Sequence, residues 1–156
     1  MAACTPELIP IKGKYNDSAS EITLAQQADS VWLNLNALLT RHGLLVKKID
    51  KVKGLLTTKE SAFIAVYTFE DDNGQLIQPQ AWVVLNKAIV KGKQWYPKAI
   101  NSQWNIQVNE TKEGTLIKID PLVMCTYYPN MFTRMVDRGK STGKLEELIK
   151  SSFNRP

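Results

Sequence analysis

The spacing of apolar residues changes twice along this chain. Over residues 20–42 and again over 142–153, apolar side chains recur every three or four positions, which is the period of a helix with one buried face. Between these segments the apolar residues alternate with polar ones or form short runs broken by turn residues, as in strands. Helices at both ends of a series of strands with short connections predict an α+β protein with an antiparallel sheet.

The first helical segment carries the clearer end signals. Ser18 followed by Glu21 fits a capping box, so the helix is predicted over residues 20–42. His42 falls in the last turn, where positive charge suits the helix dipole, and Gly43 supplies a left-handed stop. The position of His42 therefore has a structural explanation. The predicted buried face consists of Ala28, Val31, Trp32, Leu35, Leu38 and Leu39.

The middle of the chain has strand character. Asn73-Gly74 is a strong hairpin signal, so the segments on either side of it are predicted to pair with each other. Pro79 makes the second of these an edge strand or interrupts it. Residues 86–103 have the least regular pattern. The predicted strands are 44–50, 54–58, 62–69, 75–85, 104–110 and 115–120, with 122–128 continuing the last one past Pro121.

The closing helix is predicted from about Thr142 to Phe153, with Ser141 or Thr142 as its cap. Together the two helices predict a two-layer domain in which both pack on one face of a sheet of five to six strands. Residues 1–19 are rich in proline, serine and small polar residues and are predicted as a tether ahead of a single domain, 20–156. The apolar stripe of the closing helix consists of Leu145, Leu148, Ile149 and Phe153.

The composition is that of a globular domain. The chain has 156 residues, 44% hydrophobic and 22% charged, and no apolar run reaches the roughly 18 residues of a membrane-spanning helix. The formal net charge is +5, from 20 Lys and Arg against 15 Asp and Glu. Such a mild, scattered excess mostly serves solubility and does not by itself indicate a nucleic-acid or lipid partner.

The N-terminal residues allow two interpretations. Ala-Ala-Cys is what remains of a bacterial lipobox when the signal peptide is trimmed away, which would make Cys4 the lipid-bearing residue of the mature protein. The alternative is an ordinary cytosolic start in which alanine happens to precede cysteine. With Cys125 as the other cysteine, neither a disulfide framework nor a zinc cluster can be formed from cysteines alone.

Two motifs suggest ligands but lack essential positions. The run 139–142, Gly-Lys-Ser-Thr, resembles the end of a phosphate-binding loop, but Arg134 stands where that motif requires its first glycine. The acidic run 70–72 suggests calcium, but Gly74 comes too soon to be the glycine of an EF-hand loop, and the residue six places after Asp71 is Ile77. We therefore interpret the first as a loop with a helix cap and the second as a solvated turn. Neither a metal nor a cofactor is expected.

Catalytic groups are few. Cys125 lies in an apolar strand without an activating cation beside it, and His42, the single histidine, would have to be recruited from a helix end. Asp50 and Asp120 each follow Lys-Ile at the end of a predicted strand. The sequence leaves open whether these two carboxylates meet as an acid/base pair.

The segment between Trp82 and Trp104 interleaves lysines with aromatic rings. A single-strand nucleic-acid platform has this composition, because rings stack on bases while lysines neutralise phosphates. A segment whose rings fill the core, or form a protein-binding ledge, also has this composition. We favour the latter two because the segment lacks the Arg, Gly and Phe pattern of an RNA-recognition motif. The candidate binding residues are Trp95, Tyr96, Lys91, Lys93 and Lys98.

Residues 28–58 and 141–149 together resemble a known envelope pattern. In the first, a Trp-bearing amphipathic helix ends in glycine, a strand ends in Ile-Asp, and a Lys-Gly turn opens the next strand. This is similar to the repeated domain of BamC-type outer-membrane lipoproteins and to small lipoprotein-like domains of unknown function in Bacteroidetes. The resemblance implies a helix-grip or TBP-like fold, a lipid anchor on Cys4 and action by contact, and it transfers no catalytic residue.

The sequence supports three hypotheses of function. The first is a non-enzymatic, lipid-anchored domain of the cell envelope that binds a protein or surface ligand, with Trp95 and Tyr96 as contacts; Trp95→Ala should then weaken binding without unfolding the domain. The second is a cytosolic basic module that binds single-stranded nucleic acid. The third is an enzyme built on Cys125 or on Asp50 with Asp120.

Overall fold

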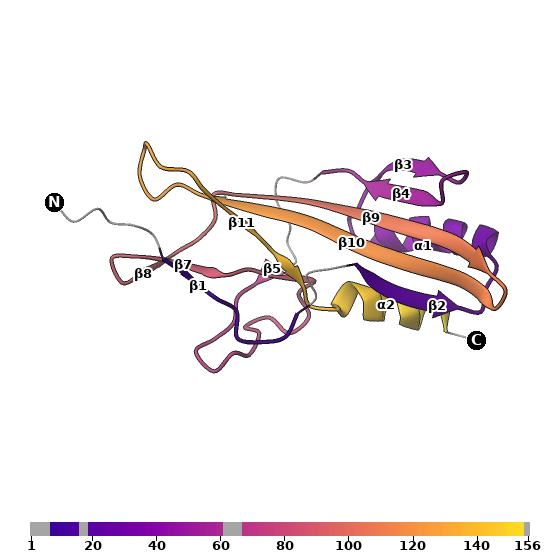
Figure 1. The fold of residues 1–156 in the computed structure, drawn as a ribbon, viewed down its shortest axis with the longest axis horizontal. Coiled ribbons are helices and arrows are strands. Elements are labelled where there is room, and N and C mark those ends of the chain that lie inside the picture. The colour runs from indigo at the N-terminus through magenta and orange to yellow at the C-terminus, as the bar shows by residue number, and fades with distance from the viewer. Residues whose placement is uncertain (1–6, 16–18, 61–66, 155–156) are drawn as a thin grey trace. The chain divides into compact units, whose positions relative to one another are not determined.

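A computed structural model describes residues 7–15, 19–60 and 67–154. It confirms the α+β class: two helices accompany sheets whose strands are mostly antiparallel (Figure 1). Neither helix in these residues has the length and hydropathy needed to cross a bilayer. The chain forms two compact units. Unit 1 comprises Met1–Tyr15, Ser61–Ser102 and Val123–Thr142, and unit 2 comprises Asn16–Glu60, Gln103–Leu122 and Gly143–Pro156.

Unit 2 contains the first helix, α1 (Ala28–Arg41). Its buried face is the predicted one, from Ala28 to Leu39. Its end is also as predicted, since His42 is the C-cap and Gly43 has φ +81°. The predicted start is wrong. The helix begins after Gln27, which makes no side-chain cap hydrogen bond.

The residues predicted as the first turns of that helix form strand β2 (Ser20–Leu24). Glu21 pairs with Lys118 across the strands instead of capping a helix, and Ser18 lies outside the described residues. The physical reason is the alternation in this segment. Ile22 and Leu24 are buried while their neighbours are not, and a period of two suits a strand.

The sheet of unit 2 is built on the long strands β9 (Ala99–Thr111) and β10 (Gly114–Tyr127), each of which also contributes residues to unit 1. The strands predicted at 104–110 and 115–120 lie within β9 and β10, which are neighbours in the sheet, and the predicted continuation past Pro121 is confirmed. Next to β9 lies β4 (Leu55–Thr58), then β3 (Val46–Asp50), and β2 pairs with β10. The pairings of β2 with β10, β3 with β4 and β4 with β9 are antiparallel.

The second helix, α2 (Lys144–Phe153), packs against β2. Leu145, Ile149 and Phe153 are buried as predicted, and Leu148 is half-buried. The predicted cap is wrong, because the N-cap is Gly143, with φ +85° and no side-chain cap hydrogen bond. The threonine of the Gly-Lys-Ser-Thr run, Thr142, instead donates its hydroxyl to the carbonyl oxygen of Ala81, and so fixes a loop of unit 1.

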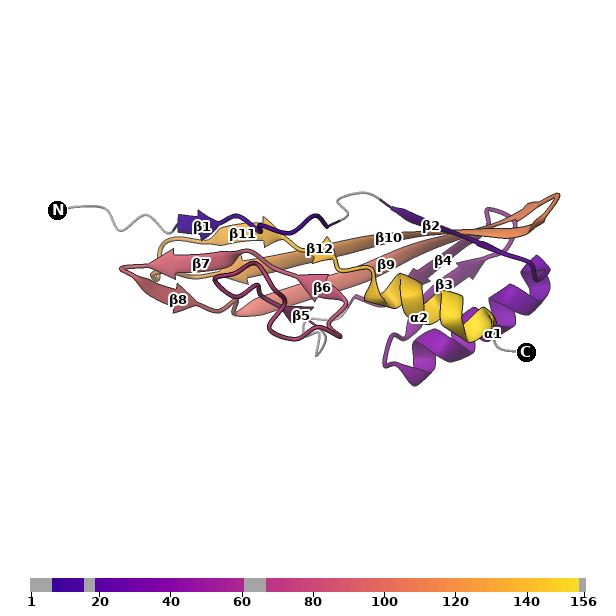
Figure 2. The same cartoon turned by 90° about the horizontal axis from the view of Figure 1, so that it is seen from below.

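Unit 1 turns the segment with the least regular sequence pattern into a hairpin. Strands β7 (Lys87–Val90) and β8 (Lys93–Trp95) pair antiparallel around Lys91-Gly92, whose φ angles are +51° and +73° (Figure 2). Two left-handed residues in a two-residue loop match the twist of the strands they join. A lysine before the glycine is a weaker signal than asparagine or aspartate, so the sequence pattern did not reveal it.

Strand β1 (Glu7–Ile9) pairs antiparallel with the other edge of β7. Residues 7–15 were part of the predicted tether, and in the structure they belong to unit 1. Ile11 donates its backbone N–H to the side-chain oxygen of Asn86, which extends the contact beyond the strand. The remaining short strands of unit 1 are β5 (Tyr67–Thr68), β6 (Val83–Val84), β11 (Met135–Arg138) and β12 (Lys140–Ser141).

The antiparallel pairing predicted around the Asn73-Gly74 turn is present but short: Asp71 donates its backbone N–H to the carbonyl oxygen of Gln75 at 2.7 Å, and Ile77 donates its N–H to Phe69 at 2.9 Å. Glu70 and Leu76 form an isolated antiparallel bridge across the turn. Beyond it the chain reverses again near Pro79, where Ala81 donates its N–H to the carbonyl oxygen of Gln78 at 3.1 Å. This second reversal makes β5 and β6 pair parallel to each other. Residues 61–66 of the first predicted arm lie outside the described residues.

Candidate ligand-binding groove

Two adjacent cavities of unit 1 share Gln94 of β8. The chain from Tyr67 to Asp72 runs along both, so we treat them as one groove with two halves. The aromatic half has a volume of about 290 Å³, and the charged half about 410 Å³. The aromatic half is lined by Tyr67, Thr68, Phe69, Ile77, Gln78 and Tyr96. The charged half carries Lys12, Glu70, Asp71, Asp72 and Lys87 around apolar side chains that include Ile9, Leu85 and Ile89.

Three rings form one wall of the aromatic half. Phe69 is buried, and its ring centroid lies 5.9 Å from that of Tyr67 and 5.7 Å from that of Tyr96. The interplanar angles of 88° and 78° are the edge-to-face arrangement that aromatic pairs prefer. Tyr96 remains 61% exposed. A rigidly backed ring that still faces solvent is suited to contact with a partner, because little side-chain freedom remains to be lost on binding.

Glu70 organises the charged half. Its carboxylate is buried and accepts hydrogen bonds from the backbone N–H of Lys12 at 2.6 Å, the N–H of Gly13 at 2.8 Å and the hydroxyl of Tyr15 at 2.9 Å. Burial acts to raise the pKa of Glu70, but these hydrogen bonds outweigh it and the pKa lies below its ordinary value. Burial, and then the bond to Glu70, raise the pKa of Tyr15 to about 12.

The acidic turn after Glu70 is held by backbone and lysine contacts. Asp71 accepts the N–H groups of Asn73 and Gln75, each at 2.9 Å. The ammonium group of Lys12 donates to the carbonyl oxygen of Asp72, and Lys87 lies 3.5 Å from the Asp72 carboxylate. These contacts fit the interpretation of a solvated turn for Asp71 and Asp72, but not for Glu70, which is buried. Within the described ranges, no cluster of three or more His, Cys, Asp or Glu side chains could hold a metal ion.

The structure separates the two predicted aromatic contacts. Tyr96 lines the groove, whereas Trp95 lies opposite the fully buried Ala88 and is half-buried. Paired residues of an antiparallel ladder point to the same face, so Trp95 shares the face of Ala88, while Gln94 shares the groove face with Ile89. Whether either ring contacts a partner stays a prediction.

The predicted lysines are exposed but do not line the groove. Lys91 lies at the tip of the β7–β8 hairpin, Lys93 opens β8, and Lys98 donates its backbone N–H to Thr126 at 2.8 Å. Trp82 and Trp104, which the interleaved pattern includes, are buried in the core. The groove lysines are Lys12 and Lys87 instead. Lys87 belongs to the interleaved segment but was not among the candidate binding residues, and Lys12 lies 75 positions earlier in the chain, outside that segment.

Of the candidate catalytic groups, the Cys125 thiol is buried, and Asp50 and Asp120 lie far from each other. Cys125 is fully buried, and its thiol donates to the carbonyl oxygen of Asp137 at 3.4 Å; burial raises its pKa to about 11. Asp50 accepts the backbone N–H of Lys53 at 3.1 Å, which lowers its pKa. Asp50 lies on β3 and Asp120 lies on β10. Because β9 and β4 lie between these two strands, the strands are about 14 Å apart in the sheet.

Comparison with known proteins adds no relative: no family model, curated protein or solved structure matches this chain. The resemblance to BamC-type lipoproteins therefore stays a prediction. Cys4, the predicted lipid anchor, lies outside the described residues.

Proposed function

We propose that this chain is a non-enzymatic binding domain of the cell envelope, held at the membrane by a lipid on Cys4. The observation that carries the binding role is the aromatic wall, in which Tyr96 is exposed while Phe69 holds its ring edge-to-face. Aromatic side chains supply much of the energy at the centres of interfaces, and a fixed ring loses little entropy on binding.

The chemistry of the groove favours a segment of protein as its ligand. An apolar or aromatic side chain fits beside Tyr96, and polar backbone groups of the ligand can meet Gln94 and the charged half. The charged half contains three carboxylates against two lysines. This balance opposes a path for phosphates, which binding of nucleic acid requires.

A role without catalysis is supported by the candidate reactive groups. The Cys125 thiol is covered and its pKa is about 11, so the nucleophilic thiolate is scarce near neutral pH. The separation of about 14 Å between the strands of Asp50 and Asp120 exceeds the 6.5–9.5 Å, roughly, of an inverting carboxylate pair.

The two-layer, helix-grip form of the fold is part of the same proposal. Within unit 2, α2 packs on β2 and α1 packs on β3, as expected where helices cover a sheet. The lipid on Cys4 and the envelope location follow from the resemblance and from the Ala-Ala-Cys sequence, and they await a measurement of the native protein.

The binding role is tested with a displayed library of short peptides panned on the whole chain. Selected peptides should lose about tenfold or more in affinity on Tyr96→Ala, because a central aromatic contact is removed. Tyr128→Ala is the matched control, since Tyr128 is also exposed but does not line the groove. Peptides that bind both variants equally would contradict the groove.

The exposed lysines in and around β8 favour a second candidate function, which is binding of single-stranded nucleic acid. Lys91, Lys93 and Lys98 are all exposed. If they bind single strands, oligothymidylate binds the chain and its affinity falls steeply with added salt. Indifference to the oligonucleotide at low salt ends this candidate.

A further inference from the structure

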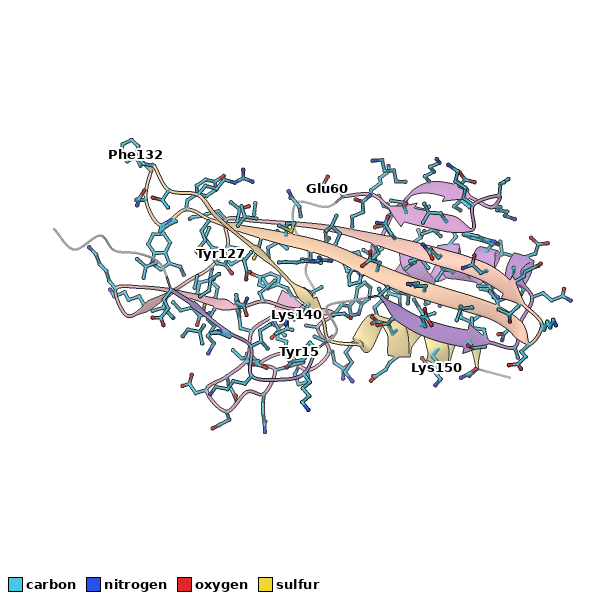
Figure 3. All side chains as sticks on the ribbon, viewed as in Figure 1. Tyr15, Glu60, Tyr127, Phe132, Lys140 and Lys150 are labelled. Atoms are coloured by element: carbon cyan, nitrogen blue, oxygen red, sulfur yellow. The ribbon has the colours of Figure 1, made fainter. Side chains whose placement is uncertain are left out.

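The loop between β10 and β11, residues 128–134, exposes apolar side chains at its tip. Met131 is 92% exposed and Phe132 is 93% exposed, and Tyr128 at the base of the loop is 46% exposed. The backbone N–H of Phe132 donates to the side-chain oxygen of Asn130 at 2.9 Å, which stabilises the local turn. Figure 3 shows the Phe132 side chain at the outer end of this loop. Two adjacent large apolar residues without any cover are unusual on a protein surface, and they indicate a contact.

Basic residues lie in this loop and elsewhere at the same end of unit 1. Arg134 lies in the loop itself, and Lys98 is fixed to Thr126 of β10, two residues before the loop begins. The β7–β8 turn, with exposed Lys91 and Lys93, lies at the same end of unit 1 (Figures 1 and 2). Glu7, at the start of β1, offsets part of this positive charge.

We propose that this end of unit 1 docks on an anionic lipid bilayer. Met131 and Phe132 enter the boundary between headgroups and acyl chains, while Arg134 and the three nearby lysines lie against the acidic headgroups. Apolar tips flanked by basic residues bind such surfaces through buried apolar area together with electrostatic attraction.

The shape of the tip favours a bilayer over a protein partner. Side chains that are more than nine-tenths exposed protrude from the surface, and acyl chains can surround a protruding side chain on all sides. The positive charge around the tip complements acidic headgroups directly.

This contact goes beyond the proposed function and does not need the lipid on Cys4. The two are compatible in space, because Cys4 and Glu7 are three positions apart and an extended chain of that length reaches about 11 Å. A lipid on Cys4 would therefore emerge within that distance of the start of β1.

The test is co-sedimentation of the full chain carrying Cys4→Ser, so that no lipid can be attached, with vesicles. One vesicle type contains equal parts of phosphatidylcholine and phosphatidylglycerol, and the other contains phosphatidylcholine alone. The chain should bind the anionic vesicles in preference, and added salt should weaken this binding. The double change Met131→Ser with Phe132→Ser should lower binding at least about tenfold, by the transfer free energy of the two side chains.

The matched control is Val52→Ser. Val52 is 99% exposed and stands between Lys51 and Lys53 in a turn of unit 2. The control variant therefore removes an equally exposed apolar side chain that also has lysine neighbours but lies outside the loop 128–134. Both variants should melt as the parent chain does, because the changed side chains are in solvent. A chain that ignores anionic vesicles overturns the proposal and leaves the loop to a protein partner. Equal loss of binding in the control and the loop variant also overturns it.

Discussion

Glu70 shows how one side chain shapes the groove. Its carboxylate accepts two backbone N–H groups and one hydroxyl from the segment 12–15, which lies more than fifty positions earlier in the chain. Hydrogen bonds to a charged acceptor are stronger than neutral ones, and a buried carboxylate without them would be costly. Glu70 therefore fixes the position of Lys12, the lysine that contacts the acidic turn.

We predict that Glu70→Gln lowers the free energy of unfolding by about 2 kcal/mol at pH 7, because an amide accepts these bonds less well and turns an NH₂ group toward donors. The folded-state pKa of Glu70 is lowered, so its contribution is full above the unfolded value of 4.5 and is lost as the pH falls through the folded value. Urea denaturation at pH 7 and under acidic conditions measures both effects.

The control for Glu70 is Glu110→Gln, which changes an exposed carboxylate. The stability difference between Glu70→Gln and the parent chain should shrink in acid, whereas the control should stay near the parent throughout. A difference for Glu70→Gln that does not change with pH would show that its charge plays no part.

Among the strands, β2 is the one whose residues the sequence pattern assigned to a helix. Ile22 and Leu24 alternate with polar residues, but Ser18 with Glu21 also fits a helix start, and the helical stripe begins only a few residues later. The stripe itself could be predicted, because helical periodicity is a local property of the sequence. The parallel pairing of β5 with β6 could not, because a local turn signal at Asn73-Gly74 does not determine what the arms do beyond Pro79.

Gly114 gives a direct test of the β2–β10 pair. It has φ +137°, and a Cβ there would lie only 2.0 Å from the carbonyl oxygen of Leu24 on β2. Gly114→Ala should therefore separate the strands locally and destabilise the protein by about 3 kcal/mol or more, measured by thermal or urea denaturation.

Gly43→Ala is the matched control for the strand pair. Gly43 also has a positive φ, +81°, but nothing lies within 4 Å of an added Cβ. It should cost only about 1 kcal/mol, the conformational term. Equal losses for the two alanine variants would mean that the close approach of β2 is not important for stability.

Across the whole chain, both proposed contact surfaces belong to unit 1. The groove gathers residues 9–12, 67–78 and 85–96, and the apolar loop is 128–134. Sequence reasoning selected Tyr96 from an aromatic and basic composition, but it could not select Phe69 or Lys12. Their role depends on which distant segments become neighbours, and that information is carried by the packing of the sheet and not by local periodicity.

The central claim is that the protein is attached to the cell envelope. The location of the protein determines which partners the groove can bind. The decisive measurement is the intact mass, with membrane fractionation, of the protein expressed from its native gene. We predict a membrane-bound protein whose mass includes a diacylglyceryl or triacyl group on Cys4. A protein that leaves the membrane fraction and whose Cys4 carries no lipid would contradict this claim.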